Sequence, residues 1–237
     1  MTETRTRTTP TMTTFQEWQN AYDYFNRFLY GGELPDCIMT LESQGKRVLG
    51  SCTRKQYVNQ DGELVDGLTM NPKYFLGRSV LDVMATLVHE MCHIWEYNFG
   101  ELGSRRTYHN KYWGDKMEAL GLMPSSTGKP GGKRTGQQMH HYIVEGGNFE
   151  EACKQLLPTF QISWADRYIL VEITDPLKLE ELKKKGVDVP LGEDLKKERK
   201  KKEKTKYTCP VCGANVWGKP EMHLICGTDN VDFEAQE

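Results

Sequence analysis

The stretch "LVHEMCHIWEYNFG", residues 87–100, lies at the centre of the predicted fold of this 237-residue chain. His89 and His93 are four residues apart, and Glu90 directly follows the first histidine. Helical positions four apart face the same side, so both imidazoles can reach one metal ion while the glutamate orients a water. This is the H-E-x-x-H pattern of zinc hydrolases, which supplies two metal ligands and a general base.

An ordinary buried helix is the alternative interpretation of this stretch. The preceding run "VLDVMATLV", residues 80–88, is apolar on most sides, as a buried helix should be. Three polar, titratable groups are costly to bury in such surroundings without a purpose. We therefore predict a helix from about Ser79 to Phe99 that carries a metal site, with Gly100 as its stop.

The third ligand is open to several candidates, because a catalytic zinc usually takes three protein ligands and keeps one position for water. His109 is favoured, since it follows a glycine-containing turn and starts the next predicted helix, so that a chain reversal returns it to the ion. Glu96 would have to reach back along its own helix. His140 and His141 follow a loop rich in Pro and Gly and are weaker candidates.

The elements on either side predict a mixed helix and sheet domain. Apolar side chains at three- and four-residue steps predict an amphipathic helix over residues 15–29. Three short β-like stretches follow before the histidine helix, with a hairpin-like turn at 59–62. The other predicted elements are helices over 109–121, 148–157 and 175–186 and a strand over 159–173.

Composition and cysteine usage restrict the class of protein. Apolar residues make up 38% of the chain and charged residues 27%, which is typical of a globular protein. No apolar run approaches the ~20 residues needed to span a bilayer, so no membrane partner is expected. The first residues lack the apolar stretch of a secretory signal, and seven cysteines form no regular framework. We expect a cytoplasmic location, associated with the nucleoid if the source is bacterial.

The net charge of −2 conceals a basic segment. Residues 195–206, "LKKERKKKEKTK", hold eight basic and two acidic residues, which is +6, so the rest of the chain carries −8. Such a run is by default a solvated spacer, but polycations also attract phosphate backbones without sequence preference. The candidate nucleic-acid contacts are Lys196, Lys197, Arg199, Lys200, Lys201 and Lys202 in this basic arm, and Lys133 and Arg134 in the loop over residues 124–136.

The last thirty residues form a separate cysteine-bearing module. Cys209 and Cys212 are spaced C-x-x-C, as in a zinc knuckle, and Cys226 is the third thiol. His223 lies three residues before Cys226 and is the favoured fourth ligand, while Asp229 and a site without metal are the alternatives. In this interpretation a structural zinc stabilises a module too small to fold alone.

These features together resemble the SprT-like zinc metallopeptidases, the group that includes the DNA–protein crosslink protease Spartan. The resemblance rests on "YDYFNRFLYGGELPDCIMTLE", "LVHEMCHIWEYNFG", "RTYHNKYWGDKMEALGL" and the terminal "KYTCPVCGANVWGKPEMHLICG". In that family a later His-x-x-x-aromatic supplies the third ligand, which here matches His109 to Trp113. A second C-x-x-C usually completes the terminal module, and this chain departs from it because Asp229 stands where the fourth cysteine would fall.

The resemblance implies an α+β fold: a zincin-like minimal metallopeptidase domain with an N-terminal helix, a small antiparallel sheet and the H-E-x-x-H helix, followed by a small zinc-ribbon module. The implied domain boundaries are a disordered N-terminus at 1–12, the SprT-like domain at 13–185, a basic linker at 186–206 and the ribbon at 207–237. One catalytic and one structural Zn²⁺ are expected, in a chain that we expect to be monomeric.

The implied activity is an endopeptidase that cleaves proteins bound or crosslinked to DNA, whether single-stranded or duplex. Glu90 activates a zinc-bound water in this mechanism. An oxyanion donor is also expected, and Tyr108, Tyr112, His141 and Tyr142 stay open for that role. The alternative functions are a non-catalytic nucleic-acid-associated binding factor that keeps the zinc fold, and a zinc hydrolase of small molecules. An intact Glu90 favours the peptidase.

Overall fold

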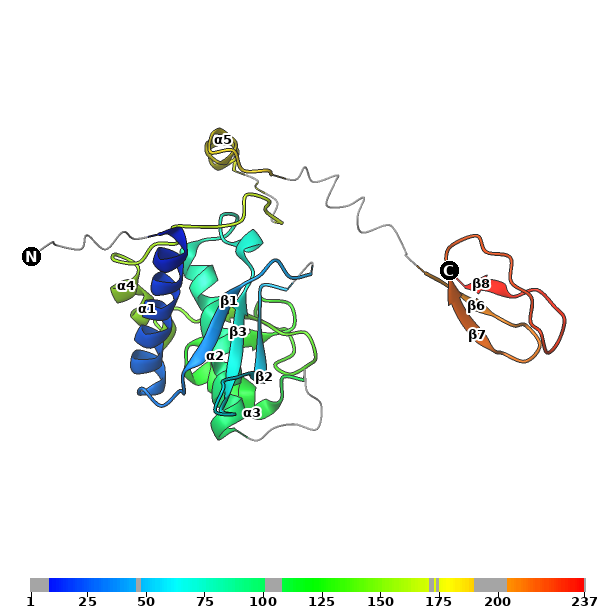
Figure 1. The fold of residues 1–237 in the computed structure, drawn as a ribbon, viewed down its shortest axis with the longest axis horizontal. Helices are drawn as coiled ribbons and strands as arrows, with labels where there is room; N and C mark the ends of the chain where they lie inside the picture. The colour runs from blue at the N-terminus through cyan, green and yellow to red at the C-terminus, as the bar shows by residue number, and fades with distance from the viewer. Residues whose placement is uncertain are drawn as a thin grey trace, which may run out of the picture. The chain divides into compact units, whose positions relative to one another are not determined.

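A computed structural model of the chain describes residues 9–45, 48–100, 108–170, 173, 175–189 and 204–236. It divides into two compact units, residues 1–189 and 190–237, and each is described by itself. Figure 1 traces the elements of both units along the chain. Within the described residues, no helix combines the length and the apolar character that crossing a membrane requires.

The first helix, α1 (Pro10–Tyr30), begins earlier than predicted. The Thr9 side chain accepts a hydrogen bond from the Met12 amide, and Pro10 occupies the first turn, where a missing N–H costs nothing. Residues 10–12 are therefore helical and do not belong to a disordered lead-in, while residues 1–8 lie outside the described part of the chain. Gly31 ends the helix in the left-handed conformation, at φ 66°.

A three-stranded sheet follows, made of β1 (Cys37–Leu41), β2 (Gly50–Val58) and β3 (Leu64–Met70) in the order β1-β3-β2. The predicted antiparallel sheet is wrong in one respect: β2 pairs antiparallel with β3, but β1 pairs parallel with it. The loop after β1 passes the end of β3, where the Asn71 side chain donates to the Val48 carbonyl at 2.8 Å. This crossing sends β2 to the far side of β3.

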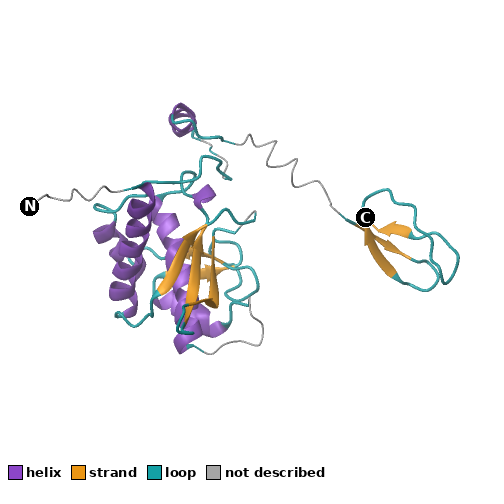
Figure 2. Ribbon diagram, viewed as in Figure 1, coloured by secondary structure: helices purple, strands orange, loops and turns teal. Residues whose placement is uncertain are grey.

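The histidine stretch forms the central helix α2 (Val80–Phe99), which lies against the sheet (Figure 2). Ser79 caps its first turn, and Gly100 follows its last residue, both as predicted. Its apolar side chains from Val83 to Ile94 are buried, and α1 packs its buried face on the same core. The helix therefore carries its polar residues into the interior of the unit.

The remaining elements of the first unit lie on both sides of α2 in the sequence. A short 3-10 helix (Pro72–Tyr74) comes before α2. After α2 follow α3 (Lys111–Ala119), the hairpin of β4 (Leu122–Ser125) and β5 (His140–Ile143), α4 (Asn148–Leu156) and α5 (Pro176–Lys184).

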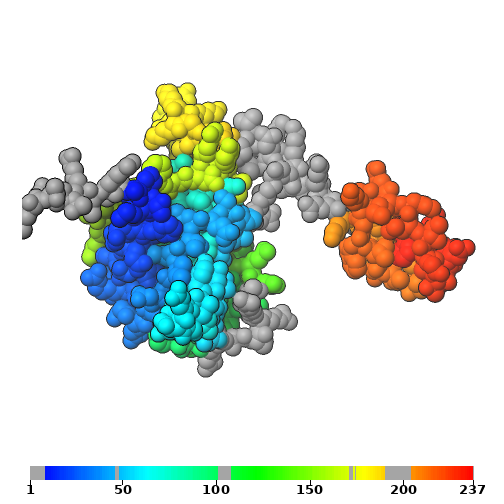
Figure 3. Space-filling model, viewed as in Figure 1, coloured from blue at the N-terminus to red at the C-terminus, as the bar shows by residue number. Residues whose placement is uncertain are grey.

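The strand predicted over residues 159–173 is not present in the described part of that range. Residues 160–166 have no regular structure, and Tyr168 forms an isolated bridge with Asp188. Ile169 instead packs with Leu182 and Val187 in a small second apolar cluster, so that α5 lies beside this segment in the space-filling view (Figure 3). Because Val187 is buried there, the first unit extends past the predicted boundary at residue 185.

The terminal unit is a small three-stranded sheet with the order β7-β6-β8. Its strands are β6 (Thr205–Thr208), β7 (Asn215–Gly218) and β8 (Glu234–Gln236), all antiparallel. Tyr207 on the central strand is buried, and its hydroxyl donates to the Lys219 carbonyl at 2.7 Å. Its first strand begins at Thr205, two residues before the predicted boundary at 207.

Candidate metal centres

His89, Glu90 and His93 lie on α2 as the four-residue spacing predicts. His89 and Glu90 are buried, with exposed fractions of 8% and 6%, and His93 is half-buried. The imidazole rings of the two histidines lie edge to face, with centroids 5.3 Å apart. One face of a single helix therefore presents two possible ligands and a carboxyl group together.

His109 reaches the same place from two residues before α3 (Lys111–Ala119). It forms a two-hydrogen-bond bridge with Gly136, in which the His109 amide donates at 2.9 Å and the Gly136 amide donates back at 3.1 Å. The ligand atoms of His89, His93 and His109 lie within 4.8 Å of one another. The structure thus brings together the three predicted ligands.

The outer nitrogens of two of these rings face hydrogen-bond acceptors. His93 Nδ1 lies 3.4 Å from Glu96 Oε2, and His109 Nδ1 lies 3.2 Å from the Gly136 carbonyl oxygen. These acceptors favour a proton on Nδ1, which leaves Nε2 unprotonated and free to bind metal. Glu96, an alternative third ligand at the sequence level, therefore lies behind His93 and also accepts from Asn110 Nδ2 at 2.8 Å.

The inner nitrogens fit a zinc ion. His93 Nε2 and His109 Nε2 are 3.1 Å apart, and two unprotonated nitrogens repel each other at that distance unless a cation lies between them. Burial, with the neighbouring His93 adding to it, lowers the pKa of His89 well below its ordinary value. Burial also lowers the pKa of His109 to about 4. Both rings are neutral at pH 7, which is the form that binds metal.

Trp113 on α3 packs against all three histidines. The distances from its ring centroid are 4.9 Å to His89, 5.4 Å to His93 and 4.4 Å to His109, and its side chain is fully buried. A rigid aromatic ring in this position restricts the imidazole planes and excludes water from one side of the centre. This is the aromatic residue of the His-x-x-x-aromatic pattern.

Glu90 is held beside the histidines in a space made by a glycine. A Cβ added to Gly50 at the start of β2 would lie 3.0 Å from Glu90 Cγ and 3.1 Å from its Oε1. Burial raises the pKa of the Glu90 carboxyl from 4.5 to about 7, against an opposing effect of His93. A carboxyl with a pKa near neutrality is suited to both accepting and donating a proton. No periodicity in the sequence marks Gly50 or Gly136 as part of the centre.

Three other candidates from the sequence have different surroundings in the structure: His141, His140 and Tyr112. His141 on β5 contacts His89, with 3.2 Å between the two Nδ1 atoms, whereas His140 on the same strand is exposed. The Tyr112 hydroxyl, a candidate oxyanion donor, donates to the Phe99 carbonyl at 3.4 Å.

In the metal-free protein, Glu90→Gln should increase stability in a pH-dependent way. A pKa raised from 4.5 to about 7 means that the folded state favours the protonated carboxyl, so this contribution is fully present below pH 4.5 and is lost as the pH rises through 7. The free energy of unfolding of the variant should therefore exceed that of the wild type by about 3 kcal/mol at pH 8 and by little at pH 4.5.

Urea unfolding of both proteins at the two pH values measures this difference in the free energy of unfolding. Glu42→Gln, at an exposed carboxyl, is the control. If the difference in unfolding free energy between Glu90→Gln and the wild type stayed constant with pH, it would contradict the burial of an unpaired Glu90 carboxyl.

Comparison with known proteins places this site in a family. A family model described as the SprT-like family matches residues 18–131, which include the three histidines and Glu90. An uncharacterized protein in the mucB 3' region of Salmonella typhimurium is 45% identical over 58 residues, which cover 24% of this chain and 77% of that protein. The chain belongs to the SprT-like family. No solved structure shows a significant match to it.

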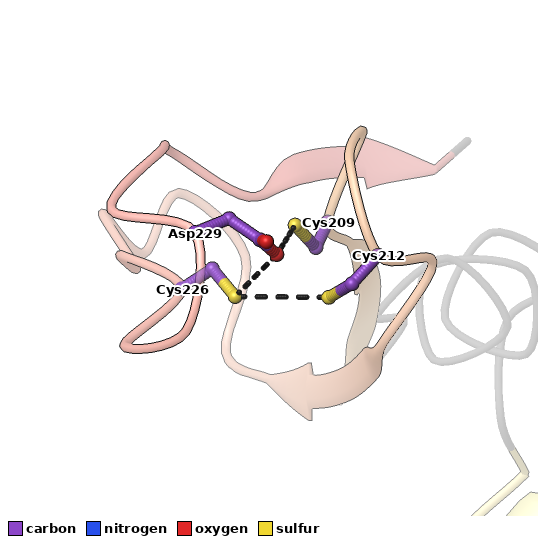
Figure 4. Close-up of side chains that lie close together, drawn as sticks. All are labelled: Cys209, Cys212, Cys226 and Asp229. Atoms are coloured by element: carbon purple, nitrogen blue, oxygen red, sulfur yellow. Dashed lines mark hydrogen bonds between the residues drawn. The ribbon is translucent and has the colours of Figure 1, made fainter.

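Beyond the region matched to the SprT-like family, the terminal unit gathers four metal-binding side chains (Figure 4). The ligand atoms of Cys209, Cys212, Cys226 and Asp229 lie within 4.8 Å of one another. Asp229 Oδ2 accepts from the thiols of Cys209 and Cys226, each at 3.2 Å. The sulfurs of Cys212 and Cys226 are 3.8 Å apart. Three thiols and one carboxylate form a donor set that suits a tetrahedral zinc site.

The first half of this cluster is a tight turn. The Cys209 amide donates to the Ala214 carbonyl at 2.9 Å, and the Gly213 amide donates to the Cys209 carbonyl at 3.0 Å. Gly213 adopts φ 72°, the left-handed conformation that glycine takes without strain. The turn places the thiol of Cys212 next to that of Cys209, as C-x-x-C spacing predicts.

The second half repeats this turn with different residues. The Cys226 amide donates to the Val231 carbonyl at 2.8 Å, and the Asn230 amide donates to the Cys226 carbonyl at 2.8 Å. Asn230 has φ 53°, so it corresponds to the glycine of the first turn. Asp229 therefore occupies the position that corresponds to Cys212, the second cysteine of the first turn.

The structure does not place His223, our predicted fourth ligand, in this cluster. Its Nε2 lies 3.1 Å from Asp232 Oδ1, and its side chain is 75% exposed. Residue spacing allows a ligand on either side of Cys226, whereas the turn that the chain forms extends forward from Cys226 to Val231. Asp229, the alternative in the sequence, is the residue that the fold brings to the thiols.

Replacement of Asp229 by alanine should weaken zinc binding at the terminal site, because three thiolates remain without their fourth partner. His223→Ala, the matched control, should leave the affinity unchanged. Asp229→Cys should bind zinc at least as tightly as the wild type, since it restores a second C-x-x-C. Competition with a chromophoric chelator measures all three. If His223→Ala lost zinc affinity and Asp229→Ala did not, His223 would be the fourth ligand after all.

The candidate nucleic-acid contacts are only partly described. Arg134 pairs with Glu118 and, at 3.3 Å, with Asp115, so its charge is already balanced on α3. Lys133 is exposed in the same loop. The basic-arm candidates Lys196, Lys197, Arg199, Lys200, Lys201 and Lys202 lie outside the described residues.

Proposed function

We propose that this SprT-like protein is a zinc-dependent endopeptidase. The observation that carries the proposal is the convergence of His89, His93 and His109 within 4.8 Å, with Glu90 on the same helix. A structural zinc site does not need a buried carboxyl group beside its ligands, and burying one is costly. Membership in the SprT-like family supports the same activity. In this proposal the first unit is a zincin-like domain.

The residues of the centre have distinct roles in the proposed reaction. His89, His93 and His109 would hold one zinc ion, which when bound supplies a Lewis acid for hydrolysis. Glu90 accepts a proton from the attacking water and passes it to the leaving amine nitrogen. In the metal-free protein, burial raises the pKa of this carboxyl to about 7, so its surroundings favour the protonated form that follows the first step. The packing of Trp113 against the three ligands keeps their rings oriented throughout.

The terminal unit would hold a second, structural zinc as a zinc ribbon. Cys209, Cys212, Cys226 and Asp229 are the ligands in this proposal, and the pair of matching turns supports it. The described part of this unit has few buried side chains, so metal ligation would replace the apolar core that it lacks.

The proposed substrates are proteins bound or crosslinked to DNA. The support is the basic arm at 195–206, with its net charge of +6, between two otherwise acidic parts of the chain. A polycationic segment can hold the protein near phosphate backbones while the centre acts on a neighbouring polypeptide. The competing function is a non-catalytic factor that binds nucleic acid and uses zinc only for its shape.

A cleavage assay separates these functions. The substrate is a protein that binds DNA, offered to the zinc-loaded chain with and without DNA. The peptidase proposal expects cleavage that increases when DNA is present, and it expects deletion of 195–206 to remove that increase. DNA binding without cleavage of any bound protein would favour the binding factor. Equal cleavage with and without DNA would refute the recruitment part.

A further inference from the structure

His141 contacts His89 at the metal centre, and the proposed reaction gives it no role. The hairpin of β4 and β5 pairs Pro124 with His141, and this register directs His141 to the back of His89. The two Nδ1 atoms are 3.2 Å apart, within hydrogen-bond distance, and the ring centroids are 5.3 Å apart. His141 lies 52 residues after His89 in the chain, so this is a tertiary contact.

His141 is not placed as a ligand. Within the described residues, the histidine group whose ligand atoms all lie within 4.8 Å of one another contains His89, His93 and His109 and omits His141. Its contact is with Nδ1 of His89, just as Glu96 contacts Nδ1 of His93 and the Gly136 carbonyl contacts Nδ1 of His109.

The chemistry of the pair decides which nitrogen donates. A neutral imidazole carries one proton, so one Nδ1 must donate and the other must accept. If His141 donated, His89 would carry its proton on Nε2 and could not bind metal through that atom. If His89 donates, its Nε2 is free. Only the second arrangement is compatible with His89 as a ligand.

We propose that His141 is a positioning residue for the metal centre: its Nδ1 accepts the proton of His89 Nδ1 and holds His89 in the tautomer whose Nε2 faces the metal. Each ligand histidine then has its own acceptor, and the segment from β4 to β5 supplies those of His89 and His109. This inference rests on the proposed metal centre and does not depend on peptide cleavage.

Three variants of the full chain test the proposal through metal affinity. Asn can place an acceptor oxygen where His has Nδ1, and Phe keeps the ring without an acceptor. His141→Phe should weaken metal binding at the histidine centre by about 10–100-fold, the usual effect of losing an outer-shell partner. His141→Asn should stay within about threefold of the wild type. His140→Phe, at the exposed neighbour on the same strand, should change nothing.

Cobalt(II) serves as the probe, because thiolate-to-metal absorption identifies the terminal site and separates it from the histidine centre. Wild-type affinity in His141→Phe would overturn the proposal. Equal losses in His141→Asn and His141→Phe would also overturn it, because the contact would then be one of packing or ligation.

A second readout needs no metal. Long-range ¹H–¹⁵N spectra of the apoprotein should show His89 protonated on Nδ1 and His141 protonated on Nε2. The opposite tautomers would refute the proposal. A chain that binds metal as expected and cleaves no protein would refute the peptidase and leave this inference intact.

Discussion

His109→Ala should remove metal from the histidine centre and abolish cleavage. The variant keeps His89 and His93 on α2 but loses the nitrogen that lies 3.1 Å from His93 Nε2. Loss of an outer-shell partner already weakens a zinc site by about 10–100-fold, so loss of a ligand should exceed the upper end of that range. Bound zinc in the purified variant should fall from two equivalents to one.

The matched control is His140→Ala, which removes an exposed imidazole from the same unit and should retain both ions. Circular dichroism confirms that the variant is folded, since His109 comes before α3 and outside the apolar core. Two equivalents of zinc in His109→Ala would contradict the assignment of the third ligand.

Cys209→Ser should unfold the terminal unit and leave the first unit folded. Among the described residues of this unit, Tyr207, Cys209 and Cys226 are the buried ones, which is too small a core to hold three short strands. Metal ligation supplies roughly 10–16 kcal/mol in zinc modules of this kind, so its loss outweighs every other interaction.

Amide NMR spectra of the full chain measure this effect residue by residue. Signals from 204–236 should collapse to random-coil positions in Cys209→Ser, and those of the first unit should stay in place. Val211→Ser is the control, because this residue is exposed in the same turn. A terminal unit that stays folded in Cys209→Ser, or after removal of zinc by a chelator, would show that metal does not stabilise it.

The parts of the site that depend on local spacing could be predicted from the sequence. His89, Glu90 and His93 are fixed by helix geometry, and the C-x-x-C turn at Cys209 and Cys212 is fixed by a short loop. Each case needs only a few consecutive residues in a regular conformation, so the pattern of residue types is sufficient.

Apart from His109, which lies sixteen residues after His93, the parts that depend on distant segments could not be predicted. Gly50 and Gly136 belong to the centre because a strand and a loop approach the ligands, and neither glycine lies in a repeating pattern. The parallel pairing of β1 with β3 depends on a loop that crosses the sheet end, which residue alternation does not reveal. Asp229 required the turn with Asn230 in the left-handed conformation, whereas spacing alone favoured His223.

The most direct test of the peptidase is cleavage by the wild type and Glu90→Gln, with zinc measured in the same samples. Glu90 is not a ligand, so both proteins should carry two equivalents of zinc. The variant should cleave a DNA-bound protein about 10²–10⁴-fold more slowly, which is the usual contribution of a general base. Equal cleavage rates at equal zinc content, or no cleavage by the zinc-loaded wild type, would contradict the proposed function.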